Sequence, residues 1–410
     1  MTFTPDNLRP QFPALSQTIE SHPVLFLDGP GGSQVPTSVL TAMTEYLGYS
    51  NSNLGGHFFS SQKTNAVMDN ARTACAALLN APSSNNIVFG ANMTSLTFQL
   101  SRAISRDWKA GDEIIVTALD HYSNVSSWQQ AAEDKGVIVH QVRVNSADCT
   151  LDMEHFYSLL SDRTVLVATT YASNTTGSLV DVDSMVAAAH HFGAMIYVDA
   201  VHYAPHHLVD VQTLECDFLV CSAYKFFGPH VGIAYVSPLY LESLSPYKVE
   251  PATNIGPGRF ETGTQSFEGL AGVSAAIEYL AQWGPKGESL RERLVTSFTQ
   301  YQQHELVLTH YFLNKVESRS WISLFGISDP EHCERRTPTF AIRLKGHTPE
   351  QVAKELGLKQ VCVWNGHFYA LGLIRQLELE ESGGVVRIGF MHYNTVDEID
   401  YLFSILDELS

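Results

Sequence analysis

The chain has 410 residues, of which 44% are hydrophobic and 17% are charged, and its formal net charge is −18. This length predicts more than one domain, and the composition is typical of a globular protein. The acidic charge opposes binding to nucleic acid or to an anionic membrane surface, and no run of about eighteen apolar residues predicts a membrane span.

The first fifteen residues, MTFTPDNLRPQFPAL, contain neither the basic nor the apolar region of a signal peptide. The six cysteines are dispersed and show no C-x-x-C spacing; they lie at positions 75, 149, 216, 221, 333 and 362. Such cysteines are typical of small core residues in a reducing compartment. We therefore expect a cytoplasmic protein.

After an N-terminal arm (1–23) that we expect to be irregular, short β-rich runs alternate with helical segments. Strands are predicted at 24–29, 85–90, 113–119, 137–144, 164–170, 194–200 and 217–223. Helices are predicted at 64–80, 93–108, 126–136, 152–160 and 184–191. This alternation predicts an α/β domain whose mostly parallel sheet is flanked by helices, and the nearly all-apolar strands suit a sheet covered on both faces.

The pattern changes near WGPKGE (283–288), where a long polar helix follows. Isolated strands are predicted at 339–344 and 385–391, and a capping box of Thr395 and Glu398 predicts the start of a terminal helix. We therefore divide the chain into the arm, a large domain (24–284) and a smaller C-terminal α+β domain (285–410).

Polar residues follow several of the predicted strands. Because ligands of open α/β sheets bind beyond the carboxyl ends of the strands, these residues are candidates for one site. They are His121, Asn174, Asp199, His202, Ser222, Tyr224 and Lys225. Met93 and Thr94 begin the helix after strand 85–90, where free amides and a hydroxyl suit an anion.

Each of these residues also has a purely structural interpretation. Lys225 could extend its ammonium to solvent, Asp199 could cap the next segment, and His121 could be a core histidine. Together they supply a nucleophilic amine, a carboxylate, an aromatic ring and an anion cradle. That set is what pyridoxal 5'-phosphate requires: a lysine for the Schiff base, an acid for the ring nitrogen and a phosphate site.

Two other motifs have weaker interpretations. The glycine-rich segment DGPGGS (28–33) lacks the spacing of a dinucleotide fingerprint, and we expect a loop at the mouth of the site. The histidines at 202, 206 and 207 could suggest a metal, but beside a cofactor site we predict no metal.

Five segments carry a resemblance to a known family: IYVDAVHYAPHHLVDVQTLECDFLVCSAYKFFGPHVGIAYV (196–236), ALDHYSNVSSWQ (118–129), YASNTTG (171–177), RFETGT (259–264) and VRIGFMHYNT (386–395). Through these five segments, the chain resembles the class V aminotransferase group over roughly residues 24–405. The resemblance is specifically to the group II cysteine desulfurases and selenocysteine lyases. The resemblance implies a pyridoxal-phosphate-dependent enzyme of fold type I that acts on a small amino acid as a homodimer.

The resemblance also implies individual roles. Lys225 would hold the cofactor and move the α-proton, Asp199 would pair with the ring nitrogen, and His121 would stack on the ring. Asn174 and His202 would approach the phenolic oxygen. The remaining cofactor contacts would come from Met93, Thr94, Ser222, Tyr224 and, from the partner subunit, Thr264.

Arg387 would bind the substrate carboxylate in a bidentate pair, with Asn53, Asn174 and Tyr369 nearby. Alternation along the strand supports this role, because Val386, Ile388 and Phe390 face one way and Arg387 faces the other. A surface ion pair is the alternative for Arg387.

The chain departs from the family at the substrate site. The Gly-His-His-Cys pattern of the desulfurases corresponds to residues 366–369, so that Tyr369 replaces the nucleophilic cysteine. Cys362, seven residues upstream, is the alternative nucleophile. Further departures are His202 for glutamine, Tyr224 for histidine, Trp364 for arginine, and the stretch 53–57.

We therefore predict lyase or elimination chemistry at Cα or Cβ without a protein persulfide. An aminotransferase or an amino-acid epimerase is the first alternative. A protein that keeps the fold for binding or regulation, without catalysis, is the second.

Overall fold

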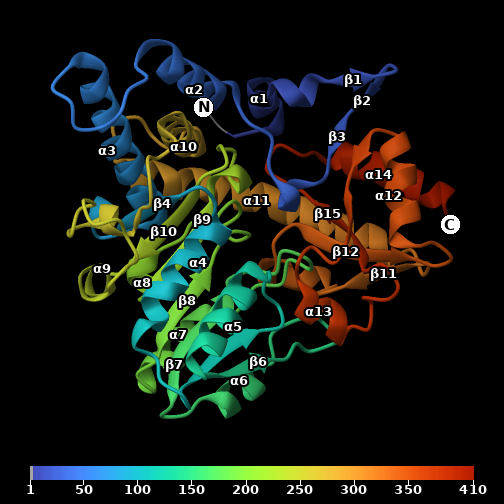
Figure 1. The fold of residues 1–410 in the computed structure, drawn as a ribbon. Helices are drawn as coiled ribbons and strands as arrows, with labels where there is room; N and C mark the ends of the chain where they lie inside the picture. The colour runs from blue at the N-terminus through green and yellow to red at the C-terminus, as the bar shows by residue number, and fades with distance from the viewer. Residues whose placement is uncertain (1–2) are drawn as a thin grey trace.

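A computed structural model describes residues 3–410. Its main sheet has seven strands in the order β4-β10-β9-β8-β7-β5-β6 (Figure 1). The strands are β4 Ile87–Gly90, β5 Glu113–Thr117, β6 Ile138–Val142, β7 Thr164–Thr170, β8 Met195–Asp199, β9 Phe218–Ser222 and β10 Gly232–Val236. β9, β8, β7, β5 and β6 are parallel, and β10 runs antiparallel to β4 and β9. The predicted, mostly parallel sheet is confirmed.

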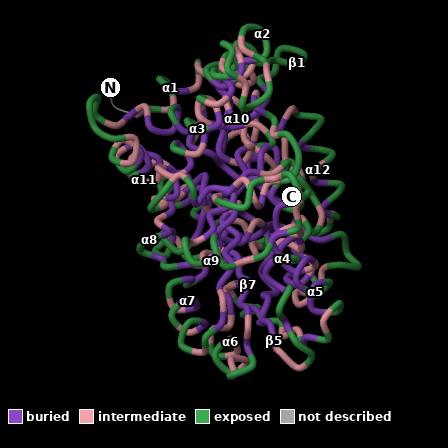
Figure 2. The backbone as a smooth tube through the Cα atoms, turned by 60° about the vertical axis from the view of Figure 1, so that its left-hand side comes forward, coloured by how far each residue is buried: buried purple, intermediate pink, exposed green. Residues whose placement is uncertain are grey.

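Helices cover both faces of this sheet, as the two hydrophobic cores show. Along β8, Ile196 and Val198 belong to one core, whereas Tyr197 belongs to the other. Successive side chains of a strand point to opposite faces, so a strand buried on both sides must be apolar throughout. The flanking helices include α4 Met93–Ile104, α5 Ser123–Lys135, α6 Met153–Leu159 and α7 Val182–His191. Buried backbone is concentrated in this central region (Figure 2).

Three helices lie together at one end of the molecule, where α10 Phe267–Leu280 packs against both α2 Thr37–Tyr49 and α3 Phe59–Leu79. α3 begins five residues before the predicted helix 64–80. It ends at Asn80, which takes the left-handed conformation (φ 53°) that commonly closes a helix.

The C-terminal part, orange and red in Figure 1, contains a four-stranded antiparallel sheet in the order β11-β12-β15-β14. Its strands are β11 Ile322–Phe325, β12 Thr339–Leu344, β14 Trp364–Gly366 and β15 Val385–Gly389. Its principal helices are α11 Leu290–Glu317, α12 Pro349–Leu358 and α14 Val396–Glu408. The predicted capping box of Thr395 and Glu398 does begin α14.

The predicted strand at 24–29 differs from expectation in length and in partner. β3 covers only Leu25–Phe26 and pairs in parallel with β13 Val361–Cys362. Leu25 and Leu27 lie in the hydrophobic core of the C-terminal part. This segment therefore packs with the C-terminal residues, and we retain the division near residue 284 as a proposal.

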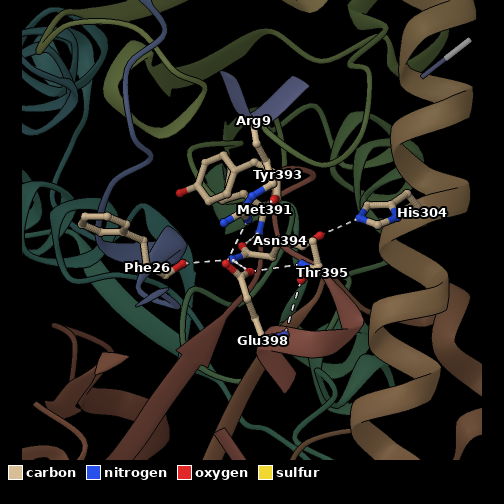
Figure 3. A network of polar contacts seen from close by, with 8 residues as sticks. All are labelled: Arg9, Phe26, His304, Met391, Tyr393, Asn394, Thr395 and Glu398. Carbon is tan, nitrogen blue, oxygen red and sulfur yellow. Dashed lines mark hydrogen bonds and ion pairs between the residues drawn. The ribbon is translucent and has the colours of Figure 1, made fainter. Parts of the chain in front are cut away.

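The N-terminal arm, expected to be irregular, contains α1 Pro5–Leu8 and is fixed by a polar network (Figure 3). The Arg9 guanidinium donates to the carbonyl of Tyr393 at 2.8 Å and to Glu398 at 2.9 Å. The Asn394 amide donates to the Phe26 carbonyl at 3.1 Å and to Glu398 at 2.8 Å. The arm, the β3 segment and the start of α14 are therefore joined at one place.

Within residues 3–410, each helix is too short or too polar to cross a membrane.

Candidate active site

A cavity lies at the carboxyl ends of the parallel strands. It is lined by residues from strand ends, from the start of α4 and from the glycine-rich loop. The predicted residues among them are Met93, Thr94, His121, Asn174, Asp199, His202, Ser222, Tyr224 and Lys225. The structure thus brings most of the predicted site residues to one cavity.

Lys225 lies in a short turn that follows β9. Its Nζ donates to the carbonyl of Pro30 and lies 4.7 Å from the centroid of the Tyr224 ring. Burial lowers the pKa of Lys225 to about 7, with a further lowering by the Arg387 charge that Asp199 and Asp28 oppose. A large share of the amine is therefore neutral near pH 7, the form that acts as a nucleophile or a base.

Asp199 is the last residue of β8 and is only 4% exposed. Its Oδ1 accepts a hydrogen bond from the Val201 amide at 2.9 Å. Burial raises the pKa of Asp199 to about 7, and this amide and Lys225 partly oppose the rise. A buried carboxylate with so few partners is stabilised by a cationic group in the cavity, such as a protonated ring nitrogen.

His121 follows β5 and is neutral near pH 7. Burial, with the charges of Lys225 and Arg387, lowers its pKa to about 4. Its Nδ1 accepts from the Ser123 amide at 3.1 Å and lies 2.7 Å from the Ser123 hydroxyl. These contacts fix the ring plane beside the cavity, where an uncharged aromatic ring can stack on another ring.

The start of α4 forms the predicted anion cradle. Asn92 caps the helix by accepting from the Ser95 amide at 2.8 Å, which leaves the amides of Met93 and Thr94 directed out of the first turn. Gly232 of β10 faces this turn, and a Cβ at that position would collide with the backbone of Asn92. The helix end and its partial positive charge therefore approach the sheet closely.

The glycine-rich segment forms a loop at the mouth of the cavity, as predicted, and Pro30 lines the cavity itself. A Cβ at Gly31 would lie 2.7 Å from the indole nitrogen of Trp364. Asp28 of this loop does not line the cavity, but its charge acts on Lys225 and Arg387; it was not predicted, because nothing in the local pattern distinguishes it from a turn aspartate. Burial raises its pKa, an effect that Arg387 partly opposes.

Arg387 lies in β15 and is 6% exposed, so the surface ion pair considered as an alternative is wrong. Its Nη1 donates to the Asn174 carbonyl at 2.9 Å, and its guanidinium carbon lies 4.1 Å from the centroid of the Phe368 ring. The Asn174 amide donates in turn to the Phe368 carbonyl at 2.9 Å. Among residues 3–410, the Arg387 Nε has no hydrogen-bond partner.

His202 is buried between the cavity and the C-terminal part. Its Nε2 lies 3.1 Å from the hydroxyl of Thr337 and 3.0 Å from that of Thr339. Burial and the neighbouring His206 hold the pKa of His202 well below its usual range. The ring is therefore neutral, and Nδ1 is the nitrogen that remains for the cavity.

Four predicted residues are absent from the lining of this cavity: Arg387, which contacts Asn174 beside it, and Asn53, Thr264 and Tyr369. Asn53 and Thr264 line a separate, open cavity, away from the strand ends of their own chain. Tyr369 is 65% exposed and stacks on His121, with ring centroids 5.2 Å apart. The cavity also contains residues that were not predicted, namely Pro30, Asn92, Ser123, Thr170, Ala172 and Val201. Ser123 could have been found from its place two residues after His121.

Within residues 3–410 all six cysteines are free. Cys362 of β13 is the least buried of them. Burial, together with the negative charge of Asp28, raises the pKa of Cys362 to about 11. Its thiolate form is therefore scarce near neutral pH.

A mostly parallel sheet that brings a buried lysine, a buried aspartate and a helix start to one cavity defines a pyridoxal-phosphate-dependent enzyme of fold type I. The family model described as aminotransferase class-V matches residues 25–402, and the chain belongs to this family. The residue set present fits pyridoxal 5'-phosphate as the cofactor.

Known proteins similar to this chain are cysteine desulfurases. Those of Escherichia coli O9:H4 (strain HS) and of Escherichia coli (strain SE11) are each 31% identical to it over 430 residues, covering 100% of this chain and 99% of theirs. An apo cysteine desulfurase from Thermococcus onnurineus NA1 superposes with a TM-score of 0.88 at 23% identity, covering 100% of this chain and 99% of its own. A cysteine desulfurase of Escherichia coli in an S-sulfonic acid form gives 0.85 at 25% identity, covering 100% and 98%.

Proposed function

We propose that the protein is a lyase that removes the Cα proton of a small amino acid and then eliminates a group at Cβ, without forming a protein persulfide. The observation that carries this proposal is the replacement of the family's nucleophilic cysteine by Tyr369, whose ring stacks on His121. A phenol cannot carry a persulfide. A sulfur- or selenium-bearing substrate would therefore release its chalcogen directly.

The residues that line the cavity would hold the cofactor. Lys225 would bond to it covalently, Asp199 would pair with its ring nitrogen and His121 would stack on its ring. The phenolic oxygen and the phosphate would be bound by Asn174, His202, Met93, Thr94, Ser222 and Tyr224. When bound, pyridoxal phosphate withdraws electrons from the Cα of an amino acid joined to it, which weakens the bonds at that carbon.

Two residues of this chain would handle the substrate. Arg387 binds its carboxylate in a bidentate pair, since the Asn174 carbonyl fixes one arm of the guanidinium and Phe368 covers one face of it. Lys225, whose pKa of about 7 leaves a neutral amine, takes the Cα proton. We place Asn53 with Thr264 at the site of a partner subunit, because both line a separate cavity in their own chain.

Cys362 is a poor substitute for the missing nucleophile. Its pKa is raised to about 11, so less than about one thiol in a thousand is a thiolate at pH 7. β13 pairs with β3, which fixes Cys362 in a short strand rather than in a mobile loop. Elimination needs only Lys225 and the electron-withdrawing cofactor, and this supports a lyase over a persulfide-forming enzyme.

A homodimer completes the proposal. Large apolar side chains are exposed around the end of α2, the start of α3 and the segment 249–255: Tyr49, Phe58, Phe59, Val249 and Ile255. Val249 also lines the cavity that contains Thr264. An apolar patch of this kind marks an interaction surface, and we assign it to a second copy of the chain. The free cysteines support a cytoplasmic location.

Amino acids screened against the cofactor-loaded protein test the reaction, with visible absorbance as the first readout and product analysis as the second. Sulfide or selenide together with an oxo acid supports the lyase. A keto acid with a pyridoxamine spectrum supports an aminotransferase, and inversion at Cα supports an epimerase. A spectrum that no amino acid changes supports a binding protein without catalysis.

A further inference from the structure

The segment between β14 and the short helix α13 Leu371–Gln376 has an unusual backbone. Phe368 and Tyr369 both take the left-handed conformation, with φ of 51° and 59°. A bulky L-residue rarely adopts this conformation, because its Cβ crowds the neighbouring carbonyl oxygen. Such strain persists only where the surrounding structure holds it, and it is concentrated at functional sites. The contacts of these two residues therefore indicate what the conformation serves.

Hydrogen bonds hold the segment against the ends of two strands of the main sheet. The Asn174 side-chain amide, after β7, donates to the Phe368 carbonyl at 2.9 Å. The Tyr122 backbone amide, after β5, donates to the Tyr369 carbonyl at 2.8 Å. Phe368 and Tyr369 thus join the C-terminal part of the chain to the edge of the sheet where the candidate active site lies.

The Phe368 ring lies on Arg387. The guanidinium carbon is 4.1 Å from the ring centroid, a distance typical of a cation–π contact. Within residues 3–410, the Arg387 guanidinium donates to the Asn174 carbonyl, and its Nε has no partner. A ring face stabilises a buried cation without using an N–H donor, whereas a carboxylate partner would occupy the edge that a substrate carboxylate needs. Phe368 therefore fixes the guanidinium plane and leaves donors free.

The Tyr369 ring lies on His121 instead. The ring centroids are 5.2 Å apart and the planes differ by 28°. Because the Tyr369 side chain is 65% exposed, the ring contributes little to the hydrophobic core. The Nδ1 atom of His121 is already held by Ser123, so the stack is a second restraint on the same imidazole. The Tyr369 ring therefore restrains His121 rather than filling the core.

We propose that Phe368 and Tyr369 are positioning residues: Phe368 orients Arg387 for the substrate carboxylate, and Tyr369 orients His121. The segment that corresponds to the nucleophile-bearing segment of the desulfurases is a clamp in this chain. This inference rests on the proposed function at one point, the binding of the substrate carboxylate by Arg387. It does not depend on which bond at Cα or Cβ is broken.

The first test measures carboxylate recognition without turnover. In the pyridoxal-phosphate-loaded protein, visible absorbance reports the binding of 2-aminoisobutyric acid, which has no Cα proton, and of isopropylamine, the corresponding amine without a carboxylate. We expect Phe368→Leu to bind 2-aminoisobutyric acid about tenfold more weakly than the wild type and isopropylamine within about twofold of it, because leucine is apolar but lacks the ring face. Phe368→Tyr, which keeps the ring, should bind both probes as the wild type does.

The outcomes of this test separate the clamp from the reaction. Unchanged binding of 2-aminoisobutyric acid in Phe368→Leu would overturn the clamp and leave the role of Arg387 intact. A wild type that binds both probes equally well would refute the role of Arg387 and, with it, that of Phe368. Failure of the proposed elimination would change neither result, because 2-aminoisobutyric acid has no Cα proton to lose.

A second readout needs neither cofactor nor substrate. NMR of the cofactor-free protein reports the Arg387 Nε–H and the ring protons of His121, whose chemical shifts depend on the aromatic ring beside them. We expect Phe368→Leu to shift the Arg387 signal and not those of His121, and Tyr369→Leu to do the reverse. Signals that stay unchanged in both variants would contradict the clamp.

The left-handed backbone provides a control for folding. Glu378, which follows α13, has φ of 58° and is exposed. Tyr369→Gly and Glu378→Gly should both unfold at a higher urea concentration than the wild type, because glycine adopts this conformation without strain. Of the two, Tyr369→Gly alone should also shift the His121 signals. A lower urea midpoint in Tyr369→Gly with unshifted His121 signals would reduce Tyr369 to a folding role and overturn the proposal.

Discussion

Lys225 shows how burial changes the chemistry of one side chain. Its only protein acceptor within residues 3–410 is the Pro30 carbonyl, and its pKa falls to about 7. Between about pH 7 and the ordinary lysine pKa of about 10.4, the unfolded chain holds a proton at this position that the folded protein lacks. The cofactor-free protein therefore gains stability from Lys225 as the pH rises through this range, and below about pH 7 it carries the full cost of a buried ammonium.

The first prediction concerns cofactor capture. The rate at which cofactor-free protein gains visible absorbance on adding pyridoxal phosphate should rise as the pH increases through about 7, because the neutral Lys225 amine forms the bond. Borohydride reduction followed by peptide mass mapping should place the adduct on Lys225. Lys225→Ala should give no such band, and Lys248→Ala, a lysine outside the cavity, should behave as wild type. A normal band in Lys225→Ala would refute the assignment.

At the scale of elements, the ends of the chain are fixed through one polar network rather than through strand pairing alone. Arg9 of the N-terminal arm bonds to Glu398 of α14, and the Arg9 and Glu398 side chains are 26% and 10% exposed. Asn394 fixes β3 to the same carboxylate. Because β3 leads directly into the glycine-rich loop at the cavity mouth, this network supports the position of Pro30 beside Lys225.

The second prediction is a loss of stability in Arg9→Met. Removing the guanidinium leaves a largely buried Glu398 oxygen without its charged partner, which should lower the free energy of unfolding by about 1–3 kcal/mol at pH 7. Urea unfolding with an unchanged m-value measures the loss. Arg375→Met, which removes the exposed pair with Glu380, is the control and should unfold as the wild type does. Equal behaviour of the two variants would show that the network adds nothing.

The elements also show what sequence alone can predict. The alternation of strands and helices follows from local hydrophobic patterns, so most of the main sheet was predicted. Neither β10 nor the pairing of β3 with β13 was predicted, because a short apolar run does not reveal with which strand it pairs. Lys225, Asp199 and His121 were found because parallel strands end at one edge. Asp28 lies in a loop beside this cavity, where its charge acts on Lys225 and Arg387, and only the folded position of that loop reveals this.

At the scale of the whole molecule, the main argument for a homodimer is that Asn53 and Thr264 lie in a cavity separate from the active-site cavity of their own chain. Neither residue reaches the strand ends of its own chain, yet both lie beside exposed apolar side chains. Two copies that bury this patch would bring each pair to the neighbouring site. The active site would then be complete only in the dimer.

The third prediction follows from this arrangement. A double variant, Phe58→Asp with Phe59→Asp, should be monomeric in sedimentation experiments, because two carboxylates would be buried in the interface. Tyr157→Asp, which alters an exposed aromatic residue on α6, should remain dimeric. A wild-type protein that sediments as a monomer while it binds the cofactor tightly would contradict the shared site.

The central claim is elimination without a sulfur-carrying cysteine, and intact-protein mass spectrometry after turnover of a sulfur-bearing amino acid tests it most directly. We predict free sulfide in solution, no gain of a sulfur atom on the protein, and the same rate in Cys362→Ser, because we propose that Tyr369 replaces the nucleophilic cysteine and because the thiolate of Cys362 is scarce. A protein that gains one sulfur atom at Cys362, and whose activity disappears in Cys362→Ser, would contradict the claim.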